Sequence, residues 1–244
     1  MELTWLGWAG VELEQEGATV VVDPLHDAGA VFAPLGEAAA AGPVPAIVAP
    51  QAGRAVAGLV THLHRDHTDA AALKAALLQA EHELAEAGLA REQLATWETV
   101  TRGPFTITAL PAVDGFGDPQ HAWLAEAGGV KVLHLGDTLF HGFWWRMALR
   151  HGPFDVVCVP VNAPRTWFPH RRPASPLPAV LDPETAAIAA ELLGARLAIP
   201  IHSEGYEVAG LYEPVSGAAE AFAVEAGRRG VPVRVLAVGE PLTL

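Results

Sequence analysis

The sequence predicts an α/β protein, because short apolar strands alternate along it with alanine-rich helical segments. Residues 19–22 form a β-branched run typical of a strand, and residues 156–161 form an apolar run typical of a buried one. The alanine-rich run from Ala70 predicts a helix with Asp69 as its N-cap. The chain has 244 residues, 51% of them apolar, and contains no repeat or clear linker. We therefore expect one domain spanning residues 1–244 with a sizeable core.

The remaining elements follow from the same periodicities and from glycine and proline breaks. Further strands are expected as a pair within residues 3–13 and at residues 97–100, 105–110, 122–125, 130–135, 197–201 and 233–238. Helices are expected at residues 70–92, up to residue 151, at residues 183–194 with Asp182 as the N-cap, and at residues 218–229. Residues 26–54 and 163–181 contain several prolines and are predicted to be loops.

Composition and charge exclude several classes of protein. The net charge of −13 argues against non-specific binding to nucleic acid or to anionic membranes, although it leaves a locally basic groove open. The single cysteine, Cys158, lies in an apolar strand and indicates a buried thiol without a disulfide framework. Neither a signal peptide nor a run of about 18 apolar residues is present, so we expect a soluble cytoplasmic protein. Homo-oligomerisation is left open.

The most informative motif is His62-Leu63-His64-Arg65-Asp66-His67, between a predicted strand and the helix that follows Asp69. In extended backbone His62 and His64 point to the same side and can bind one cation, because side chains alternate with a period of two. Asp66 and His67 follow where the chain turns, so they suit a second cation nearby. Imidazole and carboxylate are ordinary ligands of Zn, Fe and Mn. The simpler alternative is a polar loop whose histidines only form hydrogen bonds.

Other polar residues follow apolar strands and extend this candidate site. They are Asp23, Asp114, Asp137 and His202. Because parallel or mixed sheets gather such strand ends at one edge, we expect these side chains to approach the histidine motif. The sum predicts a two-metal site with His62 and His64 on one ion, Asp66, His67 and His202 on the other, and Asp137 between them. By position alone, Asp23 is either a turn former or a carboxylate that orients a ligand histidine.

The predicted loop at 163–181, called the arginine loop below, is locally basic in an acidic chain. It contains Arg165, His170, Arg171 and Arg172, and no acidic residue lies between Asp155 and Asp182. One interpretation is a solvated loop. The other is a lip that binds an anionic substrate, since guanidinium groups suit phosphate and carboxylate.

Taken in order, the histidine motif, His134-Leu135-Gly136-Asp137-Thr138 and Ile199-Pro200-Ile201-His202 resemble metallo-β-lactamase-fold hydrolases. The opening Trp5-Leu6-Gly7-Trp8-Ala9-Gly10 makes the chain most similar to the short branch of L-ascorbate-6-phosphate lactonase-like proteins. The resemblance implies a four-layer αββα sandwich with one or two Zn, Mn or Fe ions. It implies that His62 and His64 bind the first metal, that Asp66, His67 and His202 bind the second, that Asp137 bridges them, and that Asp23 orients a ligand histidine.

Two departures from this pattern matter. The family's third histidine for the first metal is missing; Asp114 is the obvious substitute and His121 the competitor. An aspartate there would shift the preference towards harder ions such as Mn, Fe or Mg. The branch's early Gly-His-Ala motif reads Gly7-Trp8-Ala9, which predicts a bulky apolar surface in place of a histidine lining the pocket.

The leading functional hypothesis is a hydrolase in which a metal-bound hydroxide, oriented by Asp66, cleaves an ester, lactone or phosphodiester of a small anionic substrate. The first alternative is an RNA- or DNA-processing nuclease, which the net charge disfavours. The second is a redox di-iron site or a metal-binding relative without catalysis.

Overall fold

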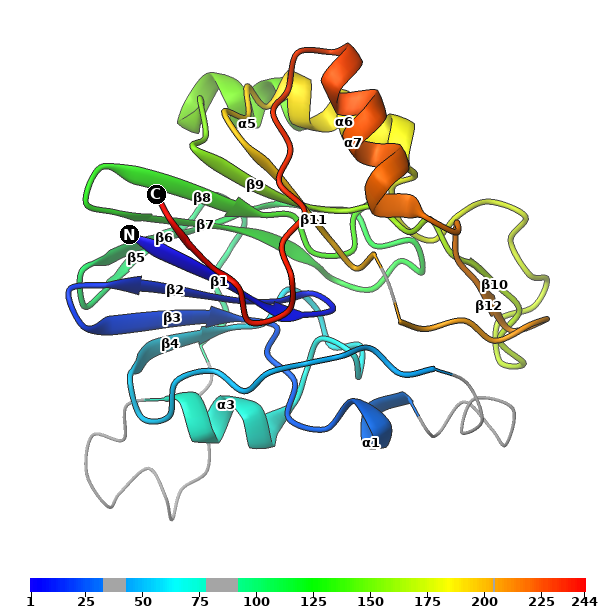
Figure 1. Ribbon diagram of the computed structural model, residues 1–244, viewed down its shortest axis with the longest axis horizontal. Coiled ribbons are helices and arrows are strands. Elements are labelled where there is room, and N and C mark those ends of the chain that lie inside the picture. The colour runs from blue at the N-terminus through cyan, green and yellow to red at the C-terminus, as the bar shows by residue number, and fades with distance from the viewer. Residues whose placement is uncertain (33–42, 78–91, 204) are drawn as a thin grey trace.

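A computed structural model describes residues 1–32, 43–77, 92–203 and 205–244, and these residues build two β-sheets packed face to face with helices outside (Figure 1). The first sheet has the order β13-β1-β2-β3-β4 and the second the order β11-β9-β8-β7-β6-β5. The strands of the first sheet are β1 (Glu2–Gly7), β2 (Gly10–Gln15), β3 (Ala18–Val22), β4 (Ala55–Leu59) and β13 (Pro241–Thr243). Those of the second are β5 (Thr99–Arg102), β6 (Phe105–Pro111), β7 (His121–Ala127), β8 (Val130–His134), β9 (Val156–Pro160) and β11 (Ala198–Ile201).

Helices cover the outer face of each sheet, which gives the predicted αββα order of layers (Figure 1). The helices α5 (Trp144–His151), α6 (Pro183–Leu192) and α7 (Ala218–Arg228) lie on the second sheet, and α1 (Ala28–Phe32) and α3 (Ala70–Ala76) lie on the side of the first. A separate pair, β10 (Arg165–Thr166) and β12 (Tyr212–Glu213), stands at one end of the sandwich. None of the helices in the described ranges combines the length and apolar character needed to cross a bilayer.

Three groups of buried side chains correspond to the three interfaces between layers. β9 shows the division clearly, since Val156 and Cys158 face the first sheet whereas Val157 and Val159 face the helices. A strand covered on both faces must be apolar at every position, which explains the continuous run Val156–Pro160. A smaller group between the first sheet and α3 contains Val21, Leu73 and Ala76.

Each of the two sheets contains parallel strands, and the carboxyl ends of these strands lie at the same edge of the sandwich. β3 pairs in parallel with β4, and β8 pairs in parallel with β9, which pairs in parallel with β11. The carboxyl ends of these strands lead directly into the segments that carry the polar residues of the candidate site. This is the convergence that the strand-end argument predicts.

The sequence predicts most elements, but α1 and β10 lie inside predicted loops, and β12 and β13 are not predicted. The strand expected at residues 233–238 is absent: Val233 pairs with Ala198 at a single bridge, and the chain then crosses to the first sheet. There Gly239 donates to the Trp5 carbonyl oxygen, and the next residues form β13 beside β1. The apolar alternation of residues 233–238 therefore reflects contact with the sandwich rather than strand pairing. The helix expected at residues 70–92 ends at Ala76, because Leu77 is extended and bridges to Ala55; residues 78–91 lie outside the described ranges.

Phe222 tests the packing of α7 on α6 and the second sheet. It is fully buried, whereas Val224 on the same helix is 54% exposed. We expect Phe222→Ala to lower the free energy of unfolding by about 3–5 kcal/mol, because truncation leaves a cavity in a packed interior. Urea denaturation followed by circular dichroism measures the change. Val224→Ala is the control and should stay within about 0.5 kcal/mol of the original protein; equal losses in both variants would contradict this packing.

Candidate metal centre

Seven potential ligands form two neighbouring clusters at the edge where the strand ends meet. The first cluster comprises His62, His64 and Asp114, and the second comprises Asp66, His67, Asp137 and His202. In each cluster one ligand atom per residue lies within 4.8 Å of every other. The rings of His62 and His67 have centroids only 4.2 Å apart, so the clusters adjoin. The sequence predicts all seven residues; Asp137 groups with the second cluster, and its bridging role stays a prediction.

Asp23 organises the loop that carries the histidine motif. It is completely buried at the end of β3, and its Oδ1 accepts a 2.9 Å hydrogen bond from the Thr61 amide. Its Oδ2 accepts from the Thr61 hydroxyl at 2.6 Å and lies 2.7 Å from Nδ1 of His67. A carboxylate accepts only, so Nδ1 of His67 carries a proton, and Nε2 is the ring nitrogen that faces the second cluster. Of the two roles open to Asp23 from the sequence, the geometry favours orienting a histidine.

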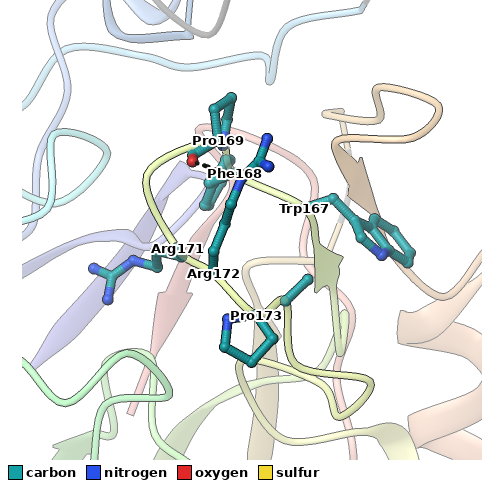
Figure 2. Close-up of a pocket in the computed structure, with 7 residues that line it drawn as sticks. Trp167, Phe168, Pro169, Arg171, Arg172 and Pro173 are labelled. Atoms are coloured by element: carbon teal, nitrogen blue, oxygen red, sulfur yellow. Dashed lines mark hydrogen bonds between the residues drawn. The ribbon is translucent and has the colours of Figure 1, made fainter.

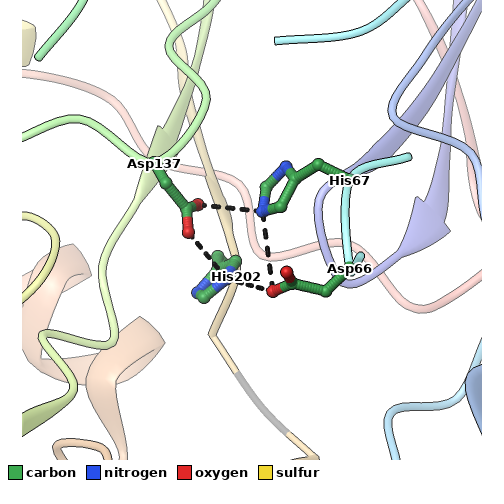
Figure 3. A group of neighbouring side chains, drawn as sticks. All are labelled: Asp66, His67, Asp137 and His202. Carbon is green, nitrogen blue, oxygen red and sulfur yellow. Dashed lines mark ion pairs between the residues drawn. The ribbon is translucent and has the colours of Figure 1, made fainter. Parts of the chain in front are cut away.

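The four side chains of the second cluster converge from three separate segments (Figure 3). Nε2 of His67 lies 3.3 Å from Oδ1 of Asp137, and Nε2 of His202 lies 3.2 Å from its Oδ2. Oδ2 of Asp66 lies 3.7 Å and 3.6 Å from the same two nitrogens. Tetrahedral ligands at about 2.0–2.1 Å from one ion stand roughly 3.3 Å apart, so these spacings suit a shared cation.

The pattern of hydrogen bonds in the second cluster also suits a bound cation. Nδ1 of His202 is 2.9 Å from the Asn162 amide oxygen, which leaves Nε2 as the inward atom. Nε2 of His67, Nε2 of His202 and Oδ1 of Asp137 are buried without a hydrogen-bond partner among the described residues. Buried polar atoms without partners are costly, and a coordinated cation would satisfy all three.

The first cluster is oriented in a similar way. Nδ1 of His62 is 3.0 Å from the Thr61 hydroxyl, and Nε2 of His64 is 2.9 Å from Oδ2 of Asp118. The remaining nitrogens, Nε2 of His62 and Nδ1 of His64, face each other at 2.7 Å. Oδ1 of Asp114 lies 3.9 Å from that His64 nitrogen, while its Oδ2 accepts from two amides of its own loop. Two nitrogens and one carboxylate oxygen are therefore available for an ion.

Two glycines allow the carboxylate loops to pack closely. Gly136 has a φ of +61°, and a Cβ there would lie 3.0 Å from the Thr61 side chain. It therefore presents Asp137 at the end of β8, as the sequence predicts. A Cβ on Gly115, next to Asp114, would lie 2.1 Å from the Ala179 carbonyl oxygen. A side chain at position 115 would thus collide with backbone, and one at position 136 would be strained by the positive φ and crowded by Thr61.

His121, the alternative to Asp114 from the sequence, is directed elsewhere. It begins β7, and its Nε2 lies 3.1 Å from the Thr96 hydroxyl. It belongs to neither cluster found in the described chain. The geometry therefore favours Asp114 as the third residue of the first cluster.

Mutual charges dominate the titration of the second cluster. Burial alone would raise the pKa of Asp137, but the imidazoles of His202 and His67 outweigh it and hold that pKa well below its usual range. Burial alone would lower the pKa of His67, but Asp137, Asp66 and Asp23 outweigh it and hold that pKa well above its usual value. The carboxylates of Asp137 and Asp66 are thus stabilised by positive charge beside them. A divalent cation would supply it and displace the imidazolium protons.

The first cluster is less crowded with charge. Burial, followed by the neighbouring charge of His67, lowers the pKa of His62 to about 4. His62 is therefore neutral near pH 7, and a neutral imidazole is the form that binds a metal. Both clusters thus combine imidazole nitrogens with carboxylate oxygens, which is the donor set expected for Zn, Mn or Fe.

Arg171 connects the arginine loop to the first cluster. Its Nη1 donates to the Phe116 carbonyl oxygen at 3.1 Å, and its Nη2 lies 3.3 Å from Oδ2 of Asp118. Its guanidinium also stacks 4.2 Å above the Phe116 ring. Because Asp118 also binds His64, Arg171 is one hydrogen-bonded residue away from a candidate ligand.

The other predicted substrate-binding residues make no hydrogen bond or ion pair with either cluster in the described chain. His170 stacks on Phe168, Arg172 donates to the Pro169 carbonyl oxygen, and Arg165 is exposed in β10. Residues 167–169 and 171–174 line a shallow hollow of about 340 Å³ (Figure 2). Arg171 and Trp167 point to opposite sides of this loop in Figure 2. Of the four predicted residues, only Arg171 approaches the candidate centre within the described chain.

The prediction that Trp8 forms an apolar pocket surface is wrong. Its side chain is 1% exposed, because the turn after β1 folds it beneath the second cluster. Sequence reasoning also missed the orienting roles of Thr61, Asn162 and Asp118. Asn162 carries a usable signal, since it follows an apolar strand as the ligands do. Asp118 carries none, because nothing in its spacing distinguishes it from a turn residue.

Comparison with known proteins identifies the family. A family model described as a beta-lactamase superfamily domain matches residues 2–202. A UPF0173 metal-dependent hydrolase from Methanoregula boonei is 30% identical over 222 residues, covering 85% of this chain and 84% of the relative. The chain belongs to the UPF0173 metal-dependent hydrolase family of the metallo-β-lactamase superfamily. It is thus a metal-dependent hydrolase, as the sequence predicts.

Two solved structures share the fold of this chain, in agreement with the predicted fold. A possible metal-dependent hydrolase from Veillonella parvula has a TM-score of 0.71 at 16% identity, covering 100% of this chain and 99% of that one. An isothiocyanate hydrolase from Delia radicum gut bacteria has a TM-score of 0.69 at 19% identity, with coverages of 100% and 99%. At these identities the likeness concerns the fold alone.

Replacing Asp23 by Asn tests its role in orienting His67. An amide can donate to Nδ1 of His67 and so turn the imidazole tautomer away from the cluster. We expect the affinity for one metal ion to fall about 10- to 100-fold, measured by competition with a chromogenic chelator. Glu16→Gln, which removes an exposed carboxylate, should leave that affinity unchanged. An unaltered affinity in Asp23→Asn would show that His67 does not depend on this carboxylate.

Proposed function

We propose that the protein uses two divalent metal ions to hydrolyse an ester, lactone or phosphodiester bond in a small anionic substrate. The observation that carries this proposal is the adjacency of two ligand clusters, with His62 and His67 ring centroids 4.2 Å apart. Two cations held in adjoining clusters would lower the pKa of a shared water and polarise the scissile oxygen. The resemblance to the lactonase-like branch favours a lactone among the three bonds.

The residues of the chain then divide the work. His62, His64 and Asp114 would hold one ion, and Asp66, His67 and His202 the other, with Asp137 as the bridging carboxylate. Asp66, whose side chain is 25% exposed, is the ligand open enough to orient a water molecule and accept its proton. Asp114 adds an oxygen donor to the first ion, which favours Mn or Fe beside Zn.

The acidic partner of Arg171 explains how substrate charge would be recognised. Oδ2 of Asp118 is shared between Arg171 and His64, and both Asp118 and Arg171 are partly exposed. An anionic group that entered beside the first ion could replace Asp118 as the partner of the guanidinium. We therefore propose Arg171, rather than Arg165, His170 or Arg172, as the main contact for that group.

Metal content tests the two-ion arrangement. We expect elemental analysis to find about two ions per chain in the original protein and about one in Asp114→Ala, because the variant loses an oxygen ligand of the first ion. His121→Ala is the matched control and should retain two. If Asp114→Ala retained both ions and His121→Ala lost one, the third residue of the first cluster would be His121.

Activity on model substrates tests the reaction and the role of Arg171. We expect the protein to hydrolyse a small lactone, phosphodiester or carboxylated aryl ester. This activity should be lost when a chelator removes the metal and restored when Zn or Mn is added. Arg171→Ala should raise KM about 10-fold or more for the anionic substrate, the value of one charge-assisted hydrogen bond. Arg165→Ala should not. A protein that holds two ions yet turns over none of these substrates would contradict the proposed reaction.

A further inference from the structure

Trp8 contacts two residues of the second cluster, Asp66 and His202. Its indole Nε1–H donates to Oδ2 of Asp66 at 3.1 Å, and its ring centroid lies 3.8 Å from that of His202. The side chain is 1% exposed, so these contacts are made inside the protein. The residue lies in the turn between β1 and β2, far in sequence from both partners.

The fold fixes Trp8 independently of Asp66. Its carbonyl oxygen accepts from the His202 amide at 2.9 Å and from the Trp5 indole at 3.1 Å. The edge of its ring system packs against Phe32, with centroids 5.1 Å apart. Its φ of +51° lies in the left-handed region, which costs about 1–2 kcal/mol in a residue other than glycine. Such a conformation persists only where surrounding contacts determine it, so the direction of the indole N–H is set before any ion binds.

Asp66 needs this support more than the other members of its cluster. Its side chain is 25% exposed, whereas those of His67 and His202 are essentially buried. The oxygen that accepts from Trp8 is the same Oδ2 that faces the two imidazole nitrogens (Figure 3). An indole N–H only donates and occupies one acceptor site of that oxygen, so the oxygen can still bind a cation.

We propose that Trp8 is a positioning residue that holds Asp66 with Oδ2 towards the second cation and leaves Oδ1 for a water molecule. This inference rests on the proposed two-metal function. The competing explanation is that Trp8 is core packing beneath His202 and that its N–H contributes nothing. The two explanations differ in whether removal of the N–H, with an aromatic ring retained, changes metal binding.

The experiment is a Co²⁺ titration of the metal-free protein, followed by the visible absorption of the bound ion. We expect Trp8→Phe to weaken one of the two binding steps about 10-fold or more and to leave the other unchanged. Trp144→Phe is the matched control. It truncates a fully buried indole whose N–H has no partner among the described residues, and both of its steps should match the original protein.

A double-variant cycle identifies the partner through which Trp8 acts. If Trp8 works through Asp66, Trp8→Phe should have no further effect on Co²⁺ affinity in an Asp66→Ala background. An equal loss in both backgrounds would assign the effect to His202 and overturn the proposal. Unchanged affinity in Trp8→Phe alone would overturn it as well. A failure of the proposed two-metal function is distinguished by the original protein, which would then bind Co²⁺ in fewer than two steps. That result would contradict the proposed function and, with it, the inference about Trp8.

A second measurement leaves Trp8 in place and so does not depend on the stability of its variant. In protein labelled with ¹⁵N-tryptophan, each of the seven tryptophans gives one indole N–H signal. We expect Asp66→Asn to shift one of these signals strongly, because the charged acceptor of a hydrogen bond is lost. Spectra in which no indole signal moves would overturn the proposal.

Discussion

The buried carboxylate of Asp23 is the contact on which the arrangement of the candidate site depends. It joins the end of β3 to the segment after β4 through two hydrogen bonds from Thr61, and it holds Nδ1 of His67. The Asp23 amide in turn donates to the Leu59 carbonyl oxygen, so the loop is also anchored through the backbone. These contacts hold the start of the histidine motif and the ring of His67, whose Nε2 faces Asp137 after β8.

Charge balance then governs what the site can hold. The second cluster places Asp66 and Asp137 beside two buried imidazoles, and these groups shift one another's pKa strongly. Such a buried group of acids and bases is stable only with positive charge among its members. Protons supply that charge in the isolated chain, and a divalent cation would supply it in a hydrolase of this superfamily.

Two residues outside the clusters, Trp8 and Asp118, contact members of the clusters. Trp8 contacts Asp66 and His202, while Asp118 is shared by His64 and Arg171. Each joins a ligand to a part of the chain with no direct role in coordination: the β1–β2 turn in one case and the arginine loop in the other. Both connections are expected to adjust the orientation of ligands, and orientation decides how well a preformed site binds its ion.

The sequence by itself determined the α/β class, most strands, the caps at Asp69 and Asp182, and all seven members of the two clusters. These follow from local rules: apolar periodicity, capping chemistry and the placement of polar residues after strands. Asp69 and Asp182 both accept hydrogen bonds from the first turns of their helices, as such rules require.

Only the tertiary structure decided which of these residues share a cluster, that Asp114 rather than His121 joins the first, and that Arg171 alone among the loop cations approaches it. It also showed that residues 233–238 leave β11 and that Trp8 is buried under His202. The physical reason is common to all of these. Each depends on how segments far apart in the sequence meet at the edge of the sandwich. Neither the periodicity of the sequence nor the spacing of residues along it gives the distance between such segments in space.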